Sequence, residues 1–402
     1  MSRFLLVVPP LAGHVNPAQG IADALLAAGH EVAWCGSEAV LRPLLGAGAV
    51  VFPTGSRLLR PQSDHGLAAV KSVWERFIVP FATFTLPAVE RAAREFRPDV
   101  LVVDQHCPAG ALVAHRLGLT WATVVASTMD LGHPLSAMPQ VTAWIEERLR
   151  GLWAKAGLPA HAYTDPRFSP HLVLSCAAGP LAGPGPFPDH FALVGPTVGT
   201  RPDQPDFPWE WLDGRAGVLV SMGTLADDIT ARFLREAVAA LAPLGERVRA
   251  VVVAPPEALP PLPAHVLARR RVPMLDLLPR MSAVLTHGGL NTVSEALAVG
   301  VPLVVAPIRH DQPINAARVV GAGAGVRVNF ARSTAPVLRA ALTGVLDDPA
   351  PRAGAAAVRD TLAAAGGAPA AARHLAALAG AAAPEPPPEP TEQAAACRSR
   401  SA

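Results

Sequence analysis

The sequence predicts an α/β fold made of two parallel-sheet domains, and two observations carry this prediction. Short apolar segments typical of buried strands alternate with helix-like segments from residue 4 to about residue 306. Such alternation is typical of parallel sheets whose strands are connected by helices. Between residues 179 and 213 the rhythm stops in a stretch rich in Pro and Gly, which indicates a linker between two such series.

The first series comprises expected strands at residues 4–8, 31–34, 99–103 and 121–125, with helices at 17–28 and 109–117. The apolar run at 4–8 is short and enters a Gly-His turn directly, which favours a strand over a secretory signal. The second series comprises expected strands at 218–221, 248–253, 283–286 and 303–306.

These series define the expected domains. We expect a first domain at residues 1–200, a linker at 201–213 and a second domain at 214–382. The Ala-rich segment 370–381 favours a final helix. Residues 383–402 are rich in Pro, Glu and polar residues, and are therefore predicted to form a disordered tail.

Composition limits the kinds of binding partner and the cellular compartment that we expect. Half of the 402 residues are hydrophobic, yet no run approaches the length of a membrane span. The net charge of +2 gives no reason to expect nucleic acid or an anionic membrane as a partner. The 4 cysteines show neither CxxC nor zinc-binding spacing, which favours reduced thiols in the cytoplasm.

The most informative segment is residues 286–295, which joins an expected strand to an expected helix. Gly288 and Gly289 let backbone amides approach a ligand closely, and the start of the helix favours phosphate. His287 can donate to a phosphate oxygen, and Glu295 can accept from ribose or sugar hydroxyls. The alternative is an ordinary turn followed by a capping box from Thr292 to Glu295.

A second polar pair follows the next expected strand. Asp311 and Gln312 place a carboxylate beside an amide, and together these groups can hold adjacent hydroxyls of a sugar ring. The alternative is helix capping, with Asp311 as the N-cap and Pro313 in the first turn. The two roles can coexist.

His14 is the candidate general base. It follows the first strand, at the sheet edge where open α/β sheets bind ligands, and Asn16 with Pro17 is expected to cap the next helix. A neutral imidazole with a pKa of about 6.5 suits proton removal from a hydroxyl. Asp104 ends another strand and could orient the imidazole. The alternatives are a surface or packing His and a turn-capping Asp.

The segment from Val272 to Asn315 resembles the donor half of nucleotide-sugar glycosyltransferases of the GT-B type, in the actinobacterial branch that tailors macrolides and other natural products. This resemblance implies two Rossmann-like domains facing each other across a cleft. It also implies inverting transfer, with His14 as the base and Asp104 as its partner. The donor residues that it implies are His287, Gly288, Gly289, Asn291, Thr292, Glu295, Asp311 and Gln312.

Two further segments complete the donor half that the resemblance implies. The strand leading to Ser221 and Thr224 resembles the loop that approaches the diphosphate from the other side. Arg271 could stack on the nucleotide base, and the Val272 backbone could read its edge. The run Val272-Pro273-Met274 is similar to transferases that use dTDP-deoxysugars, so we favour dTDP over UDP. No Asp-x-Asp metal motif occurs there, so neither a metal nor another cofactor is expected.

The acceptor side is predicted less sharply. An aromatic stripe at helical spacing and Met129 are candidate walls of a hydrophobic acceptor site, as the resemblance implies for the insertions of the first domain: Trp74, Phe77, Phe81 and Phe84. Such a stripe is more often core. The expected partners are a nucleotide sugar and a small hydrophobic acceptor such as a polyketide aglycone, and a homodimer remains open.

Two functions of other classes remain as alternatives. The chain could be a catalytically silent helper of another glycosyltransferase, or a nucleotide-sugar epimerase of the same fold. The glycines from Gly321 to Gly325 resemble a dinucleotide fingerprint, but their spacing and their place after a helix favour a helix terminus.

Overall fold

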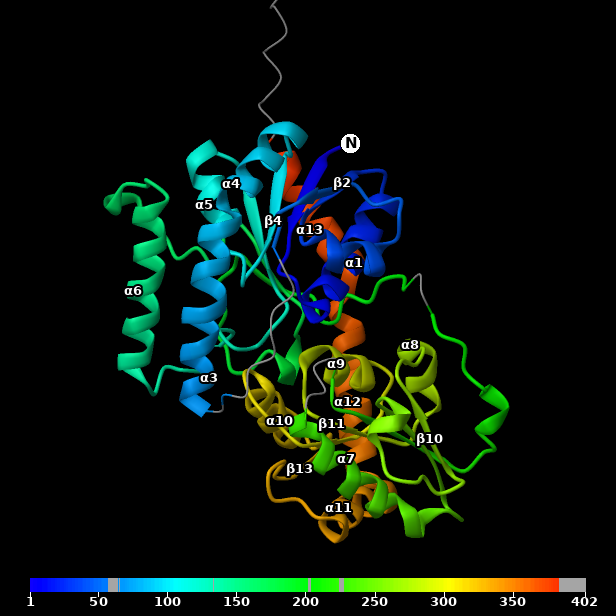
Figure 1. The fold of residues 1–402 in the computed structure, drawn as a ribbon. Helices are drawn as coiled ribbons and strands as arrows, with labels where there is room; N and C mark the ends of the chain where they lie inside the picture. The colour runs from blue at the N-terminus through cyan, green and yellow to red at the C-terminus, as the bar shows by residue number, and fades with distance from the viewer. Residues whose placement is uncertain (57–63, 65, 133, 202–203, 224–227, 383–402) are drawn as a thin grey trace, which may run out of the picture.

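Two domains lie one above the other in the computed structural model, which describes residues 1–56, 64, 66–132, 134–201, 204–223 and 228–382 (Figure 1). The disordered tail predicted at 383–402 lies outside these residues. Within the described part of the chain, no helix combines the length and the apolar character needed to cross a membrane.

The first domain is built on a sheet of seven parallel strands in the order β3-β2-β1-β4-β5-β6-β7. Their bounds are β1 (Arg3–Val7), β2 (Glu31–Gly36), β3 (Val51–Pro53), β4 (Val100–Asp104), β5 (Trp121–Val125), β6 (Val173–Ser175) and β7 (Phe191–Leu193).

The second domain is built on a sheet of six parallel strands in the order β10-β9-β8-β11-β12-β13. Their bounds are β8 (Ala216–Ser221), β9 (Val248–Val253), β10 (Val266–Arg269), β11 (Ala283–Thr286), β12 (Leu303–Val305) and β13 (Gly325–Arg327). The predicted α/β class with two parallel sheets is therefore confirmed.

Helices connect the strands of both sheets. Those of the first domain are α1 (Ala12–Ala27), α2 (Glu38–Leu45), α3 (Gly66–Ser72), the π-helix η1 (Val73–Ile78), α4 (Val79–Phe96), α5 (Pro108–Leu117) and α6 (Pro139–Lys155). Those of the second series are α7 (Asp228–Leu241), α8 (Met274–Leu277), α9 (Leu290–Ala298), α10 (Gln312–Gly321), α11 (Ala335–Asp347), α12 (Pro349–Ala365) and α13 (Gly367–Ala382). Short 3-10 turns are η2 (Ala160–Ala162), η3 (Gly179–Leu181), η4 (Trp209–Trp211), η5 (Ala242–Leu244), η6 (Pro256–Ala258) and η7 (Leu278–Arg280).

Both faces of the first sheet are covered, which explains why its strands read as continuous apolar runs. Leu5 points into a core shared with α4, α5 and α6, whereas Phe4 and Leu6 point to the opposite face, into a core shared with α1 and α13. All three side chains are fully buried. Alternate residues of β1 thus fill two different cores.

The last helix, α13, crosses from the second domain onto the first. Gly366 and Gly367 have positive φ angles of 85° and 53°, a conformation that favours glycine and turns the chain between α12 and α13. The N–H of Gly367 donates to the carbonyl of Val194 at 2.8 Å. Leu375 of α13 is then fully buried in the core that contains Ile21 of α1, and Figure 1 shows α13 running beside α1.

One predicted helix start was wrong, and the alternative of a capping box at the start of α9 is excluded. Helix α1 begins at Ala12, so Asn16 and Pro17 lie inside it rather than capping it, and His14 lies in its first turn. Helix α9 begins at Leu290 with Gly289 as its N-cap, so Thr292 and Glu295 do not form a capping box. Proline favours first turns, but the position of α1 is fixed by the apolar residues packed beneath it.

Candidate active site between the two domains

The residues predicted for the two halves of the site follow strands of different sheets and meet between the domains. His14 and Asp104 follow or end β1 and β4, and His287 follows β11. Contacts between the domains bring these sheet edges together: Asn291 of α9 donates to the Gly13 carbonyl at 2.9 Å, and Ser127 donates to Asp311 at 3.0 Å. The carboxyl ends of the two sheets therefore enclose one site.

The His14–Asp104 pair is buried and well formed. Nδ1 of His14 lies 2.8 Å from Oδ2 of Asp104, and the two residues are 8% and 2% exposed. Burial would lower the pKa of His14, but the charge and hydrogen bond of Asp104, with a smaller contribution from Asp311, raise it above its ordinary value. Because Nδ1 is occupied by the carboxylate, Nε2 is the nitrogen that can take a proton from a substrate.

Asp104 is itself held in place from the other side. The backbone N–H of His106 donates to Oδ1 of Asp104 at 2.8 Å, so both carboxylate oxygens are engaged. The His106 ring lies 4.7 Å from the His14 ring, centroid to centroid. Sequence reasoning missed His106, although its position two residues after Asp104 placed it at the same sheet edge.

The donor half is organised around the His287 ring, which lies against two glycines. A Cβ atom on Gly223 would lie 2.9 Å from His287, and one on Gly289 would lie 2.7 Å from its Nε2. Gly288 has a φ of 90°, and a Cβ there would lie 2.7 Å from Val305. Side chains at these three positions would displace the ring or the strand, so glycine is required for the close packing.

His287 is neutral in this environment. Burial lowers its pKa to about 4, against opposing contributions from Asp311 and the Ser221 carbonyl, while Arg309 lowers it further. Ser221 ends β8 directly beside Thr286 of β11. A neutral imidazole has one N–H, which the Ser221 carbonyl engages here, so donation to a phosphate oxygen would require that bond to be exchanged. Thr224, the other predicted residue of this loop, lies outside the described residues.

Pro17 explains one contact between the domains. In a helix the N–H of residue 17 would bond the carbonyl of Gly13, but proline has no N–H. The Asn291 side chain of the second domain donates to that carbonyl instead. Asn291, predicted to contact the diphosphate, thus also joins α9 to the first turn of α1, next to His14.

Asp311 and Gln312 face different ways. Asp311 accepts from Ser127 at 3.0 Å and from the backbone of Thr128 at 3.4 Å, both in the first domain. Oε1 of Gln312 accepts from the backbone N–H groups of Ile308 and Arg309 at 2.8 and 2.9 Å. The side-chain oxygen of Gln312 therefore binds the backbone of the loop that precedes it. Only the N–H groups of its side-chain amide remain for a sugar.

Asn315 connects three parts of the site and was not predicted. Its side chain accepts from Thr128 at 2.6 Å and donates to the Gly288 carbonyl at 2.9 Å. Asn315 is 1% exposed and follows Asp311 by one helical turn. That i, i+4 spacing on α10 was the available signal.

Glu295 forms an ion pair with Arg201, which follows the first domain. Glu295 is 8% exposed; burial raises its pKa, and the charge of Arg201 acts in the opposite direction. Arg201, Glu295 and Asn291 line a small cavity that also includes Asn16 and Thr197. Sequence reasoning placed Arg201 in the linker and gave it no role.

The remaining donor residues lie around this centre. Thr292 is half-buried in α9, Val272 packs at the margin of the core beneath α8, and Arg271 is exposed. Their contacts with a nucleotide stay predictions.

The aromatic stripe does not form a continuous wall, and its part in acceptor binding stays a prediction. Trp74, Phe77 and Phe81 are 1%, 7% and 9% exposed and belong to the core of the first domain, whereas Phe84 is 60% exposed. Phe81 and Phe84 both lie in α4, whose buried face includes Phe81, Thr85 and Ala88, and the spacing of three residues puts Phe84 outside that face. Met129 is 4% exposed and packs in the same core.

One group in the described part of the chain has metal-ligand geometry. Ligand atoms of His14, Asp104 and His106 lie within 4.8 Å of one another. Both Asp104 oxygens already accept hydrogen bonds, from His14 and from the His106 backbone. A metal there would have to replace the bond that orients His14, so we assign these residues to acid–base chemistry.

Comparisons with known proteins agree with this architecture. Residues 219–378 match the family model of the erythromycin biosynthesis protein CIII-like C-terminal domain. The chain is 32% identical to 4'-demethylrebeccamycin synthase of Lentzea aerocolonigenes, over 89% of this chain and 95% of that protein.

Solved structures share the fold over nearly the whole chain. The calicheamicin glycosyltransferase CalG4 superposes with a TM-score of 0.76 at 25% identity, covering 96% of this chain and 100% of CalG4. The glycosyltransferase VinC in complex with dTDP superposes with a TM-score of 0.73 at 21% identity, covering 94% and 100%. The chain therefore belongs to the family of natural-product glycosyltransferases and has their GT-B fold.

Proposed function

We propose that this enzyme transfers a sugar from a dTDP-linked or UDP-linked donor to a hydrophobic natural-product acceptor, with inversion at the anomeric carbon. The observation that carries the proposal is the buried His14–Asp104 pair, 2.8 Å apart, across the cleft from the neutral His287. A base and a site for the leaving diphosphate face one another, which is the arrangement that direct displacement needs.

The donor half supports diphosphate binding without a metal. The start of α9 offers backbone N–H groups behind Gly288 and Gly289, and the His287 N–H would join them once it leaves the Ser221 carbonyl. These donors can stabilise the negative charge that develops on the departing diphosphate. Binding of dTDP in the structure of VinC supports thymidine over uridine, as does the run Val272-Pro273-Met274.

Two carboxylates would bind the rest of the donor. Asp311 would hold sugar hydroxyls and Glu295 would hold the ribose, but both are engaged by groups of the first domain or the linker. Oδ2 of Asp311 and Oε1 of Glu295 carry these bonds, so a donor hydroxyl that needs those oxygens would have to displace Ser127 and Arg201. The cleft would open by these two exchanges before the sugar enters.

The reaction follows from this placement. The acceptor oxygen attacks the anomeric carbon while its proton passes to Nε2 of His14. The bond between that carbon and the phosphate oxygen breaks, and its electron pair leaves with the diphosphate. Asp104 stabilises the imidazolium that forms, and no second carboxylate is assigned as a nucleophile, which supports inversion.

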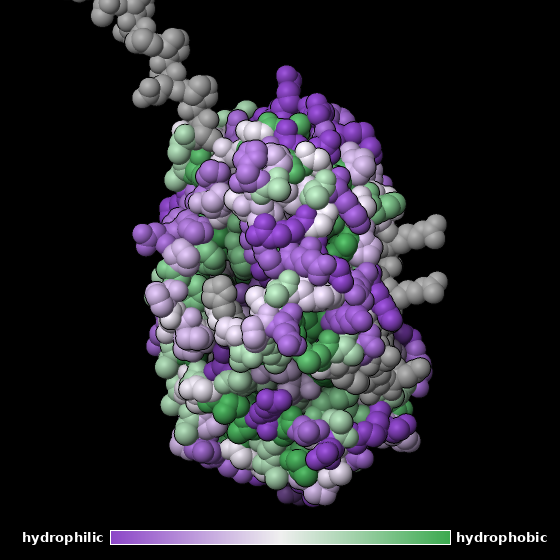
Figure 2. Space-filling model, turned by 90° about the vertical axis from the view of Figure 1, so that its left-hand side faces the viewer, coloured by the Kyte–Doolittle hydropathy of each residue, from purple (hydrophilic) through white to green (hydrophobic). Residues whose placement is uncertain are grey.

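The acceptor is proposed to be hydrophobic. On the face that carries α3 and α6, Figure 2 shows hydrophobic residues around a recess, bordered by hydrophilic ones. The relative 4'-demethylrebeccamycin synthase is named for a natural product of this kind.

The test is product formation with an α-linked donor. Purified protein is incubated with dTDP-glucose or UDP-glucose and a panel of polyketide and aromatic aglycones, and the anomeric configuration of any product is read by NMR. A β-linked product supports the proposal, and an α-linked product contradicts inversion. Donor incubated alone separates the alternatives, since an epimerised sugar would indicate an epimerase. Nucleotide binding without transfer to any aglycone would indicate a helper.

A further inference from the structure

Buried polar atoms without hydrogen-bond partners gather beside the His14–Asp104 pair. Within the described residues, both ring nitrogens of His106 and Nε1 of Trp74 have no hydrogen-bond partner. The amide of Gln105 and Oδ2 of Asp130 also lack a bond of ordinary geometry, although Gln105 lies near enough to Asp130 to lower the pKa of its carboxyl. None of the four residues is more than 8% exposed. Leaving a buried polar group unpaired destabilises the fold, so a cluster of such groups indicates that a polar group from outside the chain completes the site.

The four residues come from neighbouring segments. Gln105 and His106 follow β4, Asp130 follows β5, and β4 and β5 are adjacent in the sheet. Arg167 joins the cluster: it donates to Oδ1 of Asp130 at 2.7 Å, and its guanidinium lies 5.8 Å from the centre of the Trp74 ring. The unpaired atoms therefore lie around one arginine at the carboxyl edge of the first sheet.

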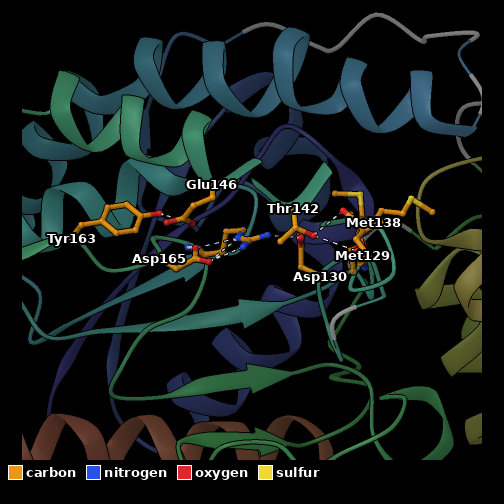
Figure 3. A network of polar contacts seen from close by, with 10 residues as sticks. Met129, Asp130, Met138, Thr142, Glu146, Tyr163 and Asp165 are labelled. Carbon is orange, nitrogen blue, oxygen red and sulfur yellow. Dashed lines mark hydrogen bonds and ion pairs between the residues drawn. The ribbon is translucent and has the colours of Figure 1, made fainter. Parts of the chain in front are cut away.

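Arg167 holds Asp130 rather than offering itself to a ligand. Its remaining nitrogens donate to Asp165 at 2.6–3.1 Å. Asp130 and Asp165 are both labelled in the network of polar contacts drawn in Figure 3. With one oxygen of Asp130 fixed in this way, the other oxygen is left as a positioned acceptor. Trp74 offers a hydrogen-bond donor instead of an acceptor, because its Nε1 can only donate.

His106 places this cluster next to the reaction centre. Burial, together with the nearby His14, lowers the pKa of His106 to about 3, so the ring is neutral and offers one donor and one acceptor. The two imidazole rings are 4.7 Å apart. A group bound by His106 would therefore be a close neighbour of the hydroxyl from which His14 removes a proton.

We infer that Gln105, His106, Asp130 and the Trp74 N–H form a polar acceptor subsite that binds a second hydroxyl of the acceptor, one or two carbons away from the hydroxyl that is glycosylated. A hydroxyl fits because it donates to Oδ2 of Asp130 and accepts from Trp74 or Gln105 at the same time. This inference rests on the proposed function, since His14 defines which hydroxyl is attacked. It names the acceptor class as hydrophobic molecules that carry a diol.

The test compares two flat apolar probes that differ by one hydroxyl. Naphthalene-2,3-diol and 2-naphthol are titrated by calorimetry into the full chain saturated with dTDP. Wild-type protein is expected to bind the diol at least about tenfold more tightly, since the second hydroxyl satisfies two hydrogen bonds that 2-naphthol leaves unmade. In His106→Phe, which keeps a ring of similar size, the affinity ratio of the two probes is expected to fall towards one.

Two further variants show whether a loss of diol preference is specific to the subsite or follows from any loss of an imidazole or of folding. His115→Phe changes an imidazole on α5 that contacts Thr164 and Trp153 away from the subsite, and it should keep the wild-type ratio. Gln105→Leu, close in volume to the original, provides a second test if His106→Phe fails to fold, as judged by thermal melting. In that variant the ratio should also fall.

Failure of the subsite and failure of the proposed function give different results in these experiments. Equal affinity for both probes in the wild type, an unchanged ratio in a folded His106→Phe or Gln105→Leu variant, or no binding of either probe would overturn the subsite. If dTDP itself fails to bind, the glycosyltransferase proposal fails first. If dTDP binds and sugar transfer occurs without a diol preference, only the subsite is wrong.

Discussion

Glu295 of α9, in the second domain, forms an ion pair with Arg201, which directly follows the first domain in the chain. The carboxylate proposed to bind the ribose of the donor therefore already has a partner in the ligand-free protein. A ribose hydroxyl that binds Oε1 of Glu295 competes with Arg201, and such competition reduces the apparent affinity for the donor by the fraction of molecules in which the pair is closed.

Removing Arg201 tests this exchange. Arg201→Ala should tighten the binding of dTDP, by up to about tenfold, because Glu295 no longer needs to be released. The same change should lower the melting temperature, since it leaves a buried carboxylate unpaired. Calorimetry and thermal melting measure the two effects. Arg215→Ala, which breaks an exposed pair with Asp213, serves as the control. Weaker dTDP binding in Arg201→Ala would show that Arg201 contacts the donor instead.

Gly289 should be intolerant of any side chain. Gly289→Ala would place Cβ 2.7 Å from Nε2 of His287 and push the ring away from the diphosphate. We expect donor affinity to fall by about tenfold or more, the effect of losing one charge-assisted hydrogen bond. Gly321→Ala is the matched control, because its Cβ would have no neighbour within 4 Å. Equal dTDP affinity in the two variants would show that the His287–Gly289 contact does not contribute to donor binding.

Asp104 should set the pH dependence of transfer. The base works only when neutral, so activity is lost as the pH falls through the pKa of His14, which Asp104 raises. In Asp104→Asn that pKa should fall, and the acidic limb of the kcat profile should move to lower pH while the plateau decreases. An acidic limb that stays in place would assign it to another group.

The raised pKa of His14 also predicts how stability depends on pH. A folded-state pKa above the unfolded value of about 6.5 stabilises the fold fully below that pH, and this contribution disappears as the pH rises through the folded pKa. The difference in melting temperature between wild type and His14→Gln should therefore be larger at pH 5.5 than at pH 9. A constant difference would contradict the raised pKa.

The packing of α13 on the first domain should contribute to stability. Leu375 is fully buried, so Leu375→Ala should cost about 2–5 kcal/mol in the free energy of unfolding. His374→Ala, at an exposed position of the same helix, should cost much less. Urea unfolding of both variants measures the difference. Equal midpoints would indicate that α13 does not depend on the first domain.

The fold was predictable from the sequence because its signals are local. Each strand of the parallel sheets is an apolar run, and the donor loop from His287 to Glu295 is contiguous in the chain. His14 and Asp104 could be paired because parallel strands β1 and β4 end at the same sheet edge.

What the sequence did not predict depends on contacts between distant residues. Nothing near Ser127 or Arg201 in the chain indicates that they bond Asp311 and Glu295, since those contacts arise only when the domains close. The helix start at Ala12 was missed for a related reason: Pro17 resembled a first-turn proline, yet its missing N–H is accommodated by Asn291 of the other domain.

In the proposed mechanism His14 removes the acceptor proton, while the donor binds to residues of the second domain. The most direct test measures dTDP affinity by calorimetry and sugar transfer to a productive aglycone by mass spectrometry, in wild type and His14→Ala. The account predicts that dTDP affinity stays within about twofold while turnover falls by about 10²–10⁴. Turnover equal to wild type in His14→Ala would contradict the mechanism.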